Sequence, residues 1–295
     1  MQYIKAKTIV TNIKPSPFWF MTDYNMNIYR GCCHGCIYCD SRSDCYRIDN
    51  FDQVKAKQGA LSLIERDLKG KRKKGVVATG AMSDPYNPAE ENLLLTRGSL
   101  ELVDKYRFGL SMATKSPLIT RDKDIIKRIA GHSNVIIKVT VTTADDALAA
   151  KIEPAAASTA LRFAAVKELA DEGIFVGILL MPVLPFINDT VENITGVVRG
   201  AARAGAKFIY ASFGVTLRAN QRDYYYAKLD KLFPGVSAKY KEYYGDAYSC
   251  VSPHVKMLMA AFKKECRRYG ILYEMKDIIA AYKTKSPPAQ LSLFE

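Results

Sequence analysis

The sequence predicts an α/β fold, a partial (β/α)6 barrel of the TIM type with a C-terminal helical extension. Short β-branched runs alternate with longer amphipathic segments, which is the order of a parallel sheet covered by helices. With the segment before Cys32 included, about six βα units are present, fewer than the eight of a complete barrel. We expect the barrel over residues 1–215, the extension over 216–285 and a tail over 286–295.

The strands are predicted from short apolar runs rich in valine, isoleucine and threonine. Strands that are buried on both faces of a parallel sheet read as continuous apolar runs of this kind. The five runs after the first strand cover residues 75–79, 108–114, 135–143, 174–181 and 207–212.

Helices are predicted between these runs, most clearly over residues 158–172. Leu161, Ala165 and Leu169 fall on one face there, and Gly173 follows as a C-cap. Cys266 lies on a similar apolar stripe near the C-terminus, so we expect a small buried side chain with no chemical role. After about residue 215 the sequence becomes rich in tyrosine and lysine, and we expect a helical extension there.

Composition and charge limit the class of protein. The 295 residues are 48% hydrophobic, and no apolar run is long enough to span a bilayer, so we expect a soluble protein. Residues 1–14 lack the apolar stretch of a signal peptide, and we expect a cytoplasmic location. Lys plus Arg outnumber Asp plus Glu by 43 to 30, which attracts polyanions such as nucleic acid, although solubility alone explains the excess equally well.

Four of the seven cysteines lie between residues 32 and 39. Cys32, Cys36 and Cys39 form a C-x3-C-x2-C pattern, in which glycines allow the backbone to fold tightly. Three thiolates on a four-iron cluster leave one iron without a protein ligand, as in catalytic sites that keep one position open. The alternative is a structural zinc site that takes its fourth ligand from Cys33, His34 or Cys45.

This cysteine spacing, with Tyr38 directly before the last cysteine, resembles the signature of the radical S-adenosylmethionine (SAM) superfamily. The resemblance implies a [4Fe-4S] cluster held by Cys32, Cys36 and Cys39, with the methionine part of SAM bound to the open iron. It further implies reductive cleavage of SAM to a 5′-deoxyadenosyl radical, with the electron supplied by an external donor. Tyr38 is expected to pack against the adenine ring.

Three further segments resemble the spore photoproduct lyase-like branch of that superfamily, and the resemblance extends from about residue 21 to the end of the chain. They read Asp-Pro-Tyr-Asn-Pro-Ala-Glu at 84–90, Thr-Lys-Ser at 114–116 and Thr-Val-Thr-Thr at 140–143. On this basis Ser83 and Asp84 belong to a ligand-binding loop. Lys115 is placed to meet the SAM carboxylate.

The remaining predicted cofactor contacts lie on later strands and helices. Thr140 and Thr142 alternate onto one face of a strand and offer hydroxyls inside the barrel. Arg162 pairs either with the cofactor carboxylate or with Glu153. Asn188 or the aspartate after it is a candidate to hold the adenosine, while that aspartate is equally suited to cap the next helix.

One residue departs from spore photoproduct lyase. That enzyme returns a hydrogen atom from a cysteine just before the Ser-Asp pair, where this chain has Met82. Tyr86, in the same loop, is our candidate for a catalytic hydrogen-atom relay, with a packed tyrosine as the alternative.

The chain ends in Gln290–Phe294 and a final glutamate, which resemble the peptide that binds the bacterial DNA sliding clamp; packing of the tail on its own domain is the alternative. With the positive charge, this favours a DNA-linked role: a radical SAM enzyme, a lyase or related, that acts on nucleic acid in a DNA repair-like reaction. Two alternatives remain, a radical SAM enzyme that acts on a peptide or small molecule, and a non-catalytic, zinc-stabilised DNA-binding or clamp-associated module.

Overall fold

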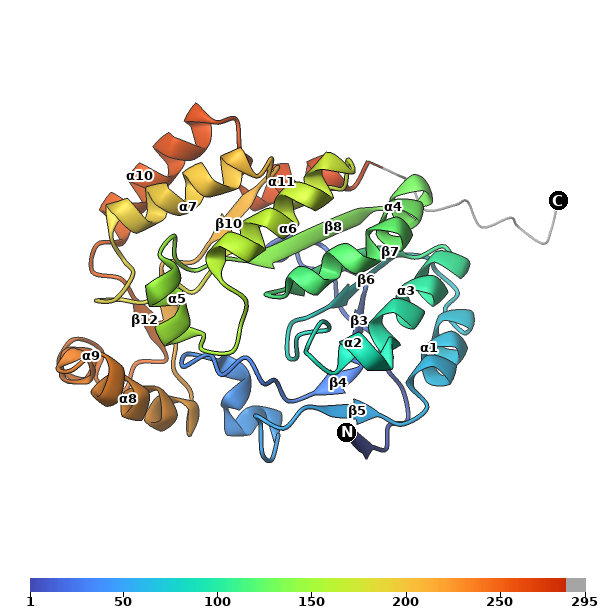
Figure 1. Cartoon of the computed structure of the whole chain (residues 1–295), viewed down its shortest axis with the longest axis horizontal. Coiled ribbons are helices and arrows are strands. Elements are labelled where there is room, and N and C mark those ends of the chain that lie inside the picture. Colours follow the sequence, from blue (N-terminus) through green and yellow to red (C-terminus); the bar gives the residue numbers. More distant parts are fainter. Residues whose placement is uncertain (285–295) are drawn as a thin grey trace.

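A sheet of seven strands forms the centre of the protein in a computed structural model, which describes residues 1–284 (Figure 1). The spatial order is β10-β9-β8-β7-β6-β3-β2. Neighbours from β10 to β3 pair in parallel, and β2 pairs antiparallel with β3 at the edge. The strands are β2 (Val10–Asn12), β3 (Tyr24–Met26), β6 (Val76–Thr79), β7 (Gly109–Thr114), β8 (Val135–Thr140), β9 (Val176–Leu180) and β10 (Ile209–Ala211).

All five strands that the apolar runs predict are present, so the open six-unit barrel is confirmed. Each is shorter than its run, by one residue at β6 and β7 and by three at β8, β9 and β10. β8 ends at Thr140 although its run continues to residue 143. Its six residues are all buried, as expected for a central parallel strand.

Helices follow the strands and cover the outer face of the sheet (Figure 1). Their apolar sides and the outward side chains of the strands make the main core. The long helices of this layer are α1 (Ala60–Lys69), α3 (Leu95–Lys105), α4 (Lys123–His132), α6 (Thr159–Asp171), α7 (Val191–Arg203) and α10 (Val255–Arg268). Two short helices, α2 (Glu90–Leu93) and α5 (Asp146–Ile152), lie in the loops after β6 and β8.

The predicted inner face of α6 is partly wrong. Ala165 and Leu169 are buried, but Leu161 is 53% exposed. Arg162 takes the inward position instead, because its guanidinium pairs with buried Glu153. Gly173 ends the segment in the left-handed region, at φ 75°, as predicted for a C-cap.

Smaller elements frame the barrel. β1 (Gln2–Ile4), β5 (Lys55–Lys57) and β4 (Tyr29–Arg30) form a separate three-stranded sheet. A two-stranded ribbon joins β11 (Gly214–Thr216) to β12 (Ser249–Val251). The 3-10 helices are η1 (Asp40–Arg42), η2 (Asp44–Tyr46) and η3 (Pro117–Asp122).

The segment after residue 215 packs in three different places. α8 (Gln221–Leu232) and α9 (Val236–Tyr244) share an apolar cluster with Cys36, Ile37 and Tyr38. α10 packs into the main core, where Cys266 is buried as predicted. α11 (Met275–Tyr282) packs against the inner face of the sheet, at the end where the strands begin. The proposed clamp-binding residues Gln290–Phe294 lie outside the described residues.

The inner face of the sheet is closed where the strands begin. Phe20, Val76 and Ile136 meet Ile278 and Tyr282 of α11 in one apolar cluster. The Tyr282 hydroxyl donates a hydrogen bond to the Phe20 carbonyl. Lys138 is buried in the same interior, with its ammonium 2.6 Å from Oγ of Ser111 and 4.6 Å from the centre of the Phe20 ring.

Two general observations complete the fold. All seven cysteines are free thiols. Within residues 1–284, no helix is both long and apolar enough to cross a bilayer.

Candidate active site

The three predicted cluster cysteines lie on one tightly folded loop after β4. Gly31 and Gly35 adopt positive φ angles of 80° and 68°, and a Cβ atom on Gly31 would lie 2.6 Å from the Phe51 carbonyl oxygen. Backbone N–H groups anchor both parts of the loop, since Cys32 donates to Phe51 at 2.8 Å and Ile37 donates to Ile152 at 3.0 Å. The loop is therefore shaped by its backbone and held on two sides.

The cysteines face a pocket at the ends of β6, β7 and β8. This is the edge of a parallel sheet at which active sites form. The pocket is lined by all three predicted cluster ligands and by side chains from the three strand ends: Cys32, His34, Cys36, Tyr38, Cys39, Ser41, Gly80, Ala81, Met82, Ser83, Asp84, Ala113, Thr114, Lys115 and Thr140. Eight of the eleven predicted cofactor-binding and metal residues thus line one pocket.

The chemistry of the three thiols fits a cationic cluster. Burial raises the pKa of Cys32 to about 12 and raises the pKa of Cys36 and Cys39 as well, while Lys115 opposes the increase at the latter two. Buried thiolates need positive charge beside them, and iron supplies it. The donor set therefore suits the [4Fe-4S] cluster that the spacing predicts.

Asp84 is the centre of a hydrogen-bond network in this pocket. Its carboxylate accepts hydrogen bonds from the Thr114 hydroxyl at 2.6 Å, the Lys115 N–H at 2.7 Å and the Tyr86 N–H at 2.9 Å. Its Oδ2 atom is also 2.9 Å from Nε2 of His34. Burial would raise the pKa of Asp84, but these bonds outweigh it and lower the pKa.

His34 has a place in the site that the sequence did not suggest. We considered it only as a zinc ligand, whereas the structure pairs it with Asp84 and places it in the pocket wall. A histidine between cluster cysteines was the available signal. Its partner, 50 residues later in the chain, was not recognisable from the sequence.

A second buried network lies beside Cys39. The Tyr38 hydroxyl donates to the Glu153 carboxylate, which also forms an ion pair with Arg162 at 2.5 Å. Arg162 donates to the Thr140 carbonyl at 3.1 Å, and the Lys115 ammonium lies 5.8 Å from the centre of the Tyr38 ring. Of the two partners expected for Arg162, the structure has Glu153.

Some buried polar atoms in this region have no hydrogen-bond partner within the described part of the chain. They include Nη2 of Arg162, Oγ of Ser83 and Oγ1 of Thr142. Such orphaned groups are costly unless a ligand or water satisfies them. They are the donors and acceptors that a polar cofactor would use.

Four predicted site residues lie outside the pocket lining: Tyr86, Thr142, Arg162 and Asn188. The Asn188 side chain accepts from the Leu184 N–H at 2.5 Å and donates to the Thr142 carbonyl at 2.8 Å, so it ties the loop after β9 to the end of β8. The next residue, Asp189, accepts from Ser252 and does not cap α7. Thr190 is the N-cap.

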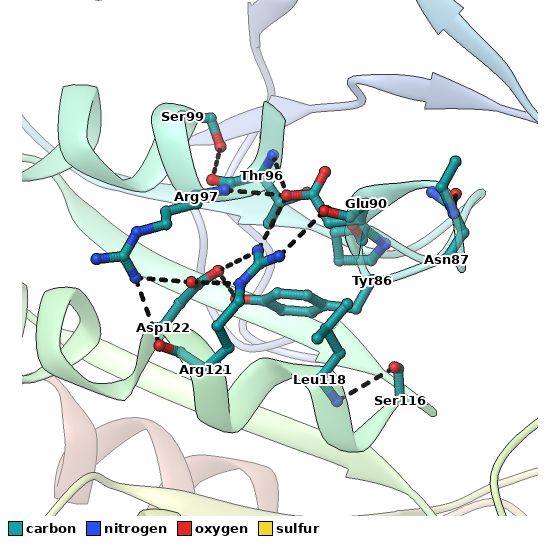
Figure 2. A network of polar contacts seen from close by, with 12 residues as sticks. Tyr86, Asn87, Glu90, Thr96, Arg97, Ser99, Ser116, Leu118, Arg121 and Asp122 are labelled. Atoms are coloured by element: carbon teal, nitrogen blue, oxygen red, sulfur yellow. Dashed lines mark hydrogen bonds and ion pairs between the residues drawn. The ribbon is translucent and has the colours of Figure 1, made fainter. Parts of the chain in front are cut away.

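Tyr86 belongs to a different network, shown in Figure 2. Its ring is 1% exposed, and its hydroxyl donates to Asp122 at 3.0 Å. Asp122 is also held by Arg97 and Arg121, and Arg121 reaches Glu90. The structure therefore brings the Tyr86 backbone to Asp84 but directs the Tyr86 hydroxyl toward Asp122.

Comparison with known proteins identifies the family. The Radical SAM superfamily model matches residues 26–198. The chain therefore belongs to the radical SAM superfamily, and it is an enzyme whose cofactors are a [4Fe-4S] cluster and SAM. This overturns the alternative of a non-catalytic zinc-stabilised module, because the superfamily consists of enzymes that use an iron–sulfur cluster.

Relatives are found in bacteria and archaea. An uncharacterized Mycobacterium tuberculosis protein is 28% identical over 278 residues, which cover 92% of this chain and 82% of the relative. An uncharacterized Methanocaldococcus jannaschii protein is 32% identical over 215 residues, which cover 72% of this chain and 76% of the relative.

Solved structures of spore photoproduct lyase share the fold. One variant superposes with a TM-score of 0.65 at 14% identity, covering 92% of this chain and 80% of that one. A second variant, with bound AdoMet and dinucleoside spore photoproduct, has the same TM-score, identity and coverage. This likeness confirms the partial barrel and shows that the chain shares its fold with spore photoproduct lyase.

Proposed function

We propose that this radical SAM enzyme acts on a nucleic-acid substrate in a DNA repair-like reaction. The observation that carries the proposal is the pocket itself, in which Cys32, Cys36 and Cys39 meet Asp84 and Lys115 in the fold of spore photoproduct lyase. One solved structure of that lyase contains bound dinucleoside spore photoproduct. The net charge of +13 adds support, since a positive protein attracts polyanions.

Cys32, Cys36 and Cys39 would hold the cluster, and Lys115 would bind the carboxylate of SAM. When bound, the cluster and SAM supply a 5′-deoxyadenosyl radical that abstracts hydrogen from the substrate. Lys115 suits its role because it lines the pocket with the thiols and its charge favours the thiolates of Cys36 and Cys39. The charges of Cys36 and Glu153 raise the pKa of Lys115 against the effect of burial. It therefore remains charged at neutral pH.

The other predicted residues fall into two groups around the cofactors. Ser83, Thr140 and Arg162 offer hydroxyl and guanidinium groups at or beside the pocket, and we assign them to polar contacts with SAM. Tyr38 would pack its ring against the adenine, and the bond from its hydroxyl to Glu153 fixes the ring in place. Thr142 would offer its unpartnered Oγ1 to the cofactor as well. Asn188 would have an indirect role, because its bond to the Thr142 carbonyl fixes the strand end that carries Thr140.

The step that returns hydrogen to the product must differ from that of spore photoproduct lyase. Met82 lines the pocket where that enzyme has its cysteine, and a thioether has no S–H bond to give. Tyr86 directs its hydroxyl to Asp122, so a role as a relay requires that bond to break. The remaining candidates for the group that returns the hydrogen atom are the substrate, the cofactor and Cys33.

The test is anaerobic reconstitution with iron and sulfide, reduction by dithionite, addition of SAM and chromatography of 5′-deoxyadenosine. We expect the product in the wild type and in Cys45→Ala, a matched control at an exposed cysteine, and none in Cys36→Ala. The substrate is tested by adding an ultraviolet-irradiated oligonucleotide, an untreated one, or a peptide mixture. Stimulation by the irradiated DNA supports the proposal. Stimulation by peptide alone would refute the nucleic-acid substrate and leave the radical enzyme in place.

A further inference from the structure

We propose that the end of the barrel where the strands begin carries a second polyanion-binding surface, remote from the cofactor pocket, that fits the phosphate backbone of a nucleic-acid duplex. We call it the basal patch and define it by six basic residues: Lys71, Arg72, Lys73, Lys74, Arg107 and Lys283. The inference does not depend on the proposed substrate, because the patch lies outside the active site.

Three chain segments converge at the basal patch. The loop from α1 to β6 supplies residues 71–74, Arg107 precedes β7, and Lys283 follows α11. Lys283 lies 4.0 Å from Asp23, whose carboxylate accepts the N–H of Val76 at the start of β6. Burial lowers the pKa of Lys283, Asp23 opposes this, and Lys73 adds to it, so Lys73 and Lys283 act on each other.

Aromatic rings hold part of the patch in place. The Lys71 ammonium lies 5.3 Å from the centre of the Tyr24 ring, and that of Lys74 lies 4.5 Å from the centre of the Phe108 ring. The two rings pack edge to face, with centres 5.6 Å apart. Two ammonium groups are therefore fixed over one aromatic pair, which lowers the entropy lost when they bind phosphates.

The basal patch has little counter-charge of its own. Among residues 1–284, the pair between Lys283 and Asp23 is the only ion pair that its six members form. Other surface lysines have acidic partners, since Lys105 pairs with Glu65 at 2.8 Å and Lys123 with Glu168 at 2.6 Å. The uncompensated charge of the patch therefore produces a positive potential available to an outside anion.

The patch and the pocket lie at opposite ends of the sheet. Arg107 precedes Gly109, the first residue of β7, while Thr114 at the end of β7 lines the pocket. Six residues of strand span about 20 Å. A phosphate at the patch therefore belongs to a different stretch of duplex from a nucleotide in the pocket. The patch would hold the enzyme on DNA without selecting the lesion, and binding there should depend strongly on salt.

The test compares two double variants of the full-length holoenzyme that change net charge equally. Arg72→Glu/Lys73→Glu alters two exposed members of the patch, and Lys256→Glu/Lys264→Glu alters two exposed lysines of α10. The probe is a fluorescein-labelled, undamaged duplex of about 20 base pairs, titrated by anisotropy at several KCl concentrations. We expect the patch variant to lose at least about tenfold in affinity at low salt. The slope of log K against log[salt] should become flatter by about 2, because two basic side chains that each contact a phosphate are removed.

We expect the α10 control to stay within about threefold of the wild type, and SAM cleavage by the patch variant to be unchanged. Equal losses of affinity in both double variants would overturn the proposal. The excess of basic residues would then act on DNA only through the overall charge of the protein. Repeating the titration with Cys36→Ala separates the two proposals. Binding that persists there and is lost in the patch variant supports the basal patch even if the active site takes no nucleic acid, whereas binding that follows the cluster refutes it.

Discussion

Nε2 of His34, between two cluster cysteines, lies 2.9 Å from Oδ2 of Asp84 in the loop after β6. The other ring nitrogen is 3.4 Å from the Ala155 carbonyl oxygen. Because Asp84 also binds Thr114 and the backbone of Lys115, this one pair connects the cysteine loop to two strand ends. The loop with the predicted cluster ligands and the predicted ligand of SAM are thus positioned by a common carboxylate.

Replacement of that carboxylate should loosen the site. In Asp84→Asn the amide keeps the shape but cannot accept all four hydrogen bonds, so buried donors lose their partner at about 1–3 kcal/mol each. We expect lower retention of iron and sulfide after gel filtration and a lower Tm. Asp49→Asn, at an exposed position, is the control. Full iron content with an unchanged Tm in Asp84→Asn would contradict this role.

Glu153→Gln should destabilise the protein strongly. The substitution leaves the Arg162 guanidinium buried without its counter-charge, which costs about 3–5 kcal/mol. Urea denaturation of the purified protein measures the loss. Tyr38→Phe removes only one hydrogen bond to the same carboxylate and should cost about 1 kcal/mol while weakening SAM binding. If the two variants were equally stable, the ion pair would not be the main contribution.

Lys138→Met should stabilise the protein, and more at low pH. Burial lowers the pKa of Lys138 from 10.5 to about 7. Below pH 7 the folded protein therefore holds a buried charge. Between about pH 7 and 10.5 the folded amine is neutral while the unfolded one still binds a proton, so wild-type stability rises with pH in this window.

Urea denaturation at pH 6 and pH 9.5 tests the Lys138 prediction. We expect Lys138→Met to gain on the order of 2–4 kcal/mol at pH 6 and clearly less at pH 9.5. Lys167→Met, at an exposed lysine of α6, should change little at either pH. A gain of the same size at both pH values would show that packing, not charge burial, is the cause.

Tyr86→Phe separates packing from catalysis. The variant loses the hydrogen bond to Asp122, which should lower the free energy of unfolding by about 1–2 kcal/mol. We expect the ratio of 5′-deoxyadenosine to substrate-derived product to stay at the wild-type value. A rise in that ratio would indicate that hydrogen return passes through Tyr86, as the loop sequence first suggested.

Local patterns in the sequence predicted the fold well, and they singled out the three cysteines that we expect to hold the cluster. The strands were recognisable because each is a short run buried on both faces, and the cysteines because their spacing is short and specific. The buried partnerships were not, since Tyr38 and Glu153 lie 115 residues apart and His34 and Asp84 lie 50 apart. Nothing in a local pattern encodes such pairs.

The errors have the same origin. Leu161 fits an apolar stripe but is exposed. Arg162 is buried in its place, because buried Glu153 requires a cation as its partner. The aspartate at 189 looked like a helix cap, yet Ser252, far along the chain, is its partner. In each case a distant polar contact outweighed a local preference.

The bond between Tyr282 and Phe20 has a consequence for how the protein is made. Phe20 belongs to the first segment of the barrel to leave the ribosome, whereas α11 is the last helix described. A nascent chain without Met275–Tyr282 therefore has an incomplete apolar floor beneath Val76 and Ile136. Closure of the barrel requires a contact between residues 262 positions apart, which places it among the late and slow steps of co-translational folding.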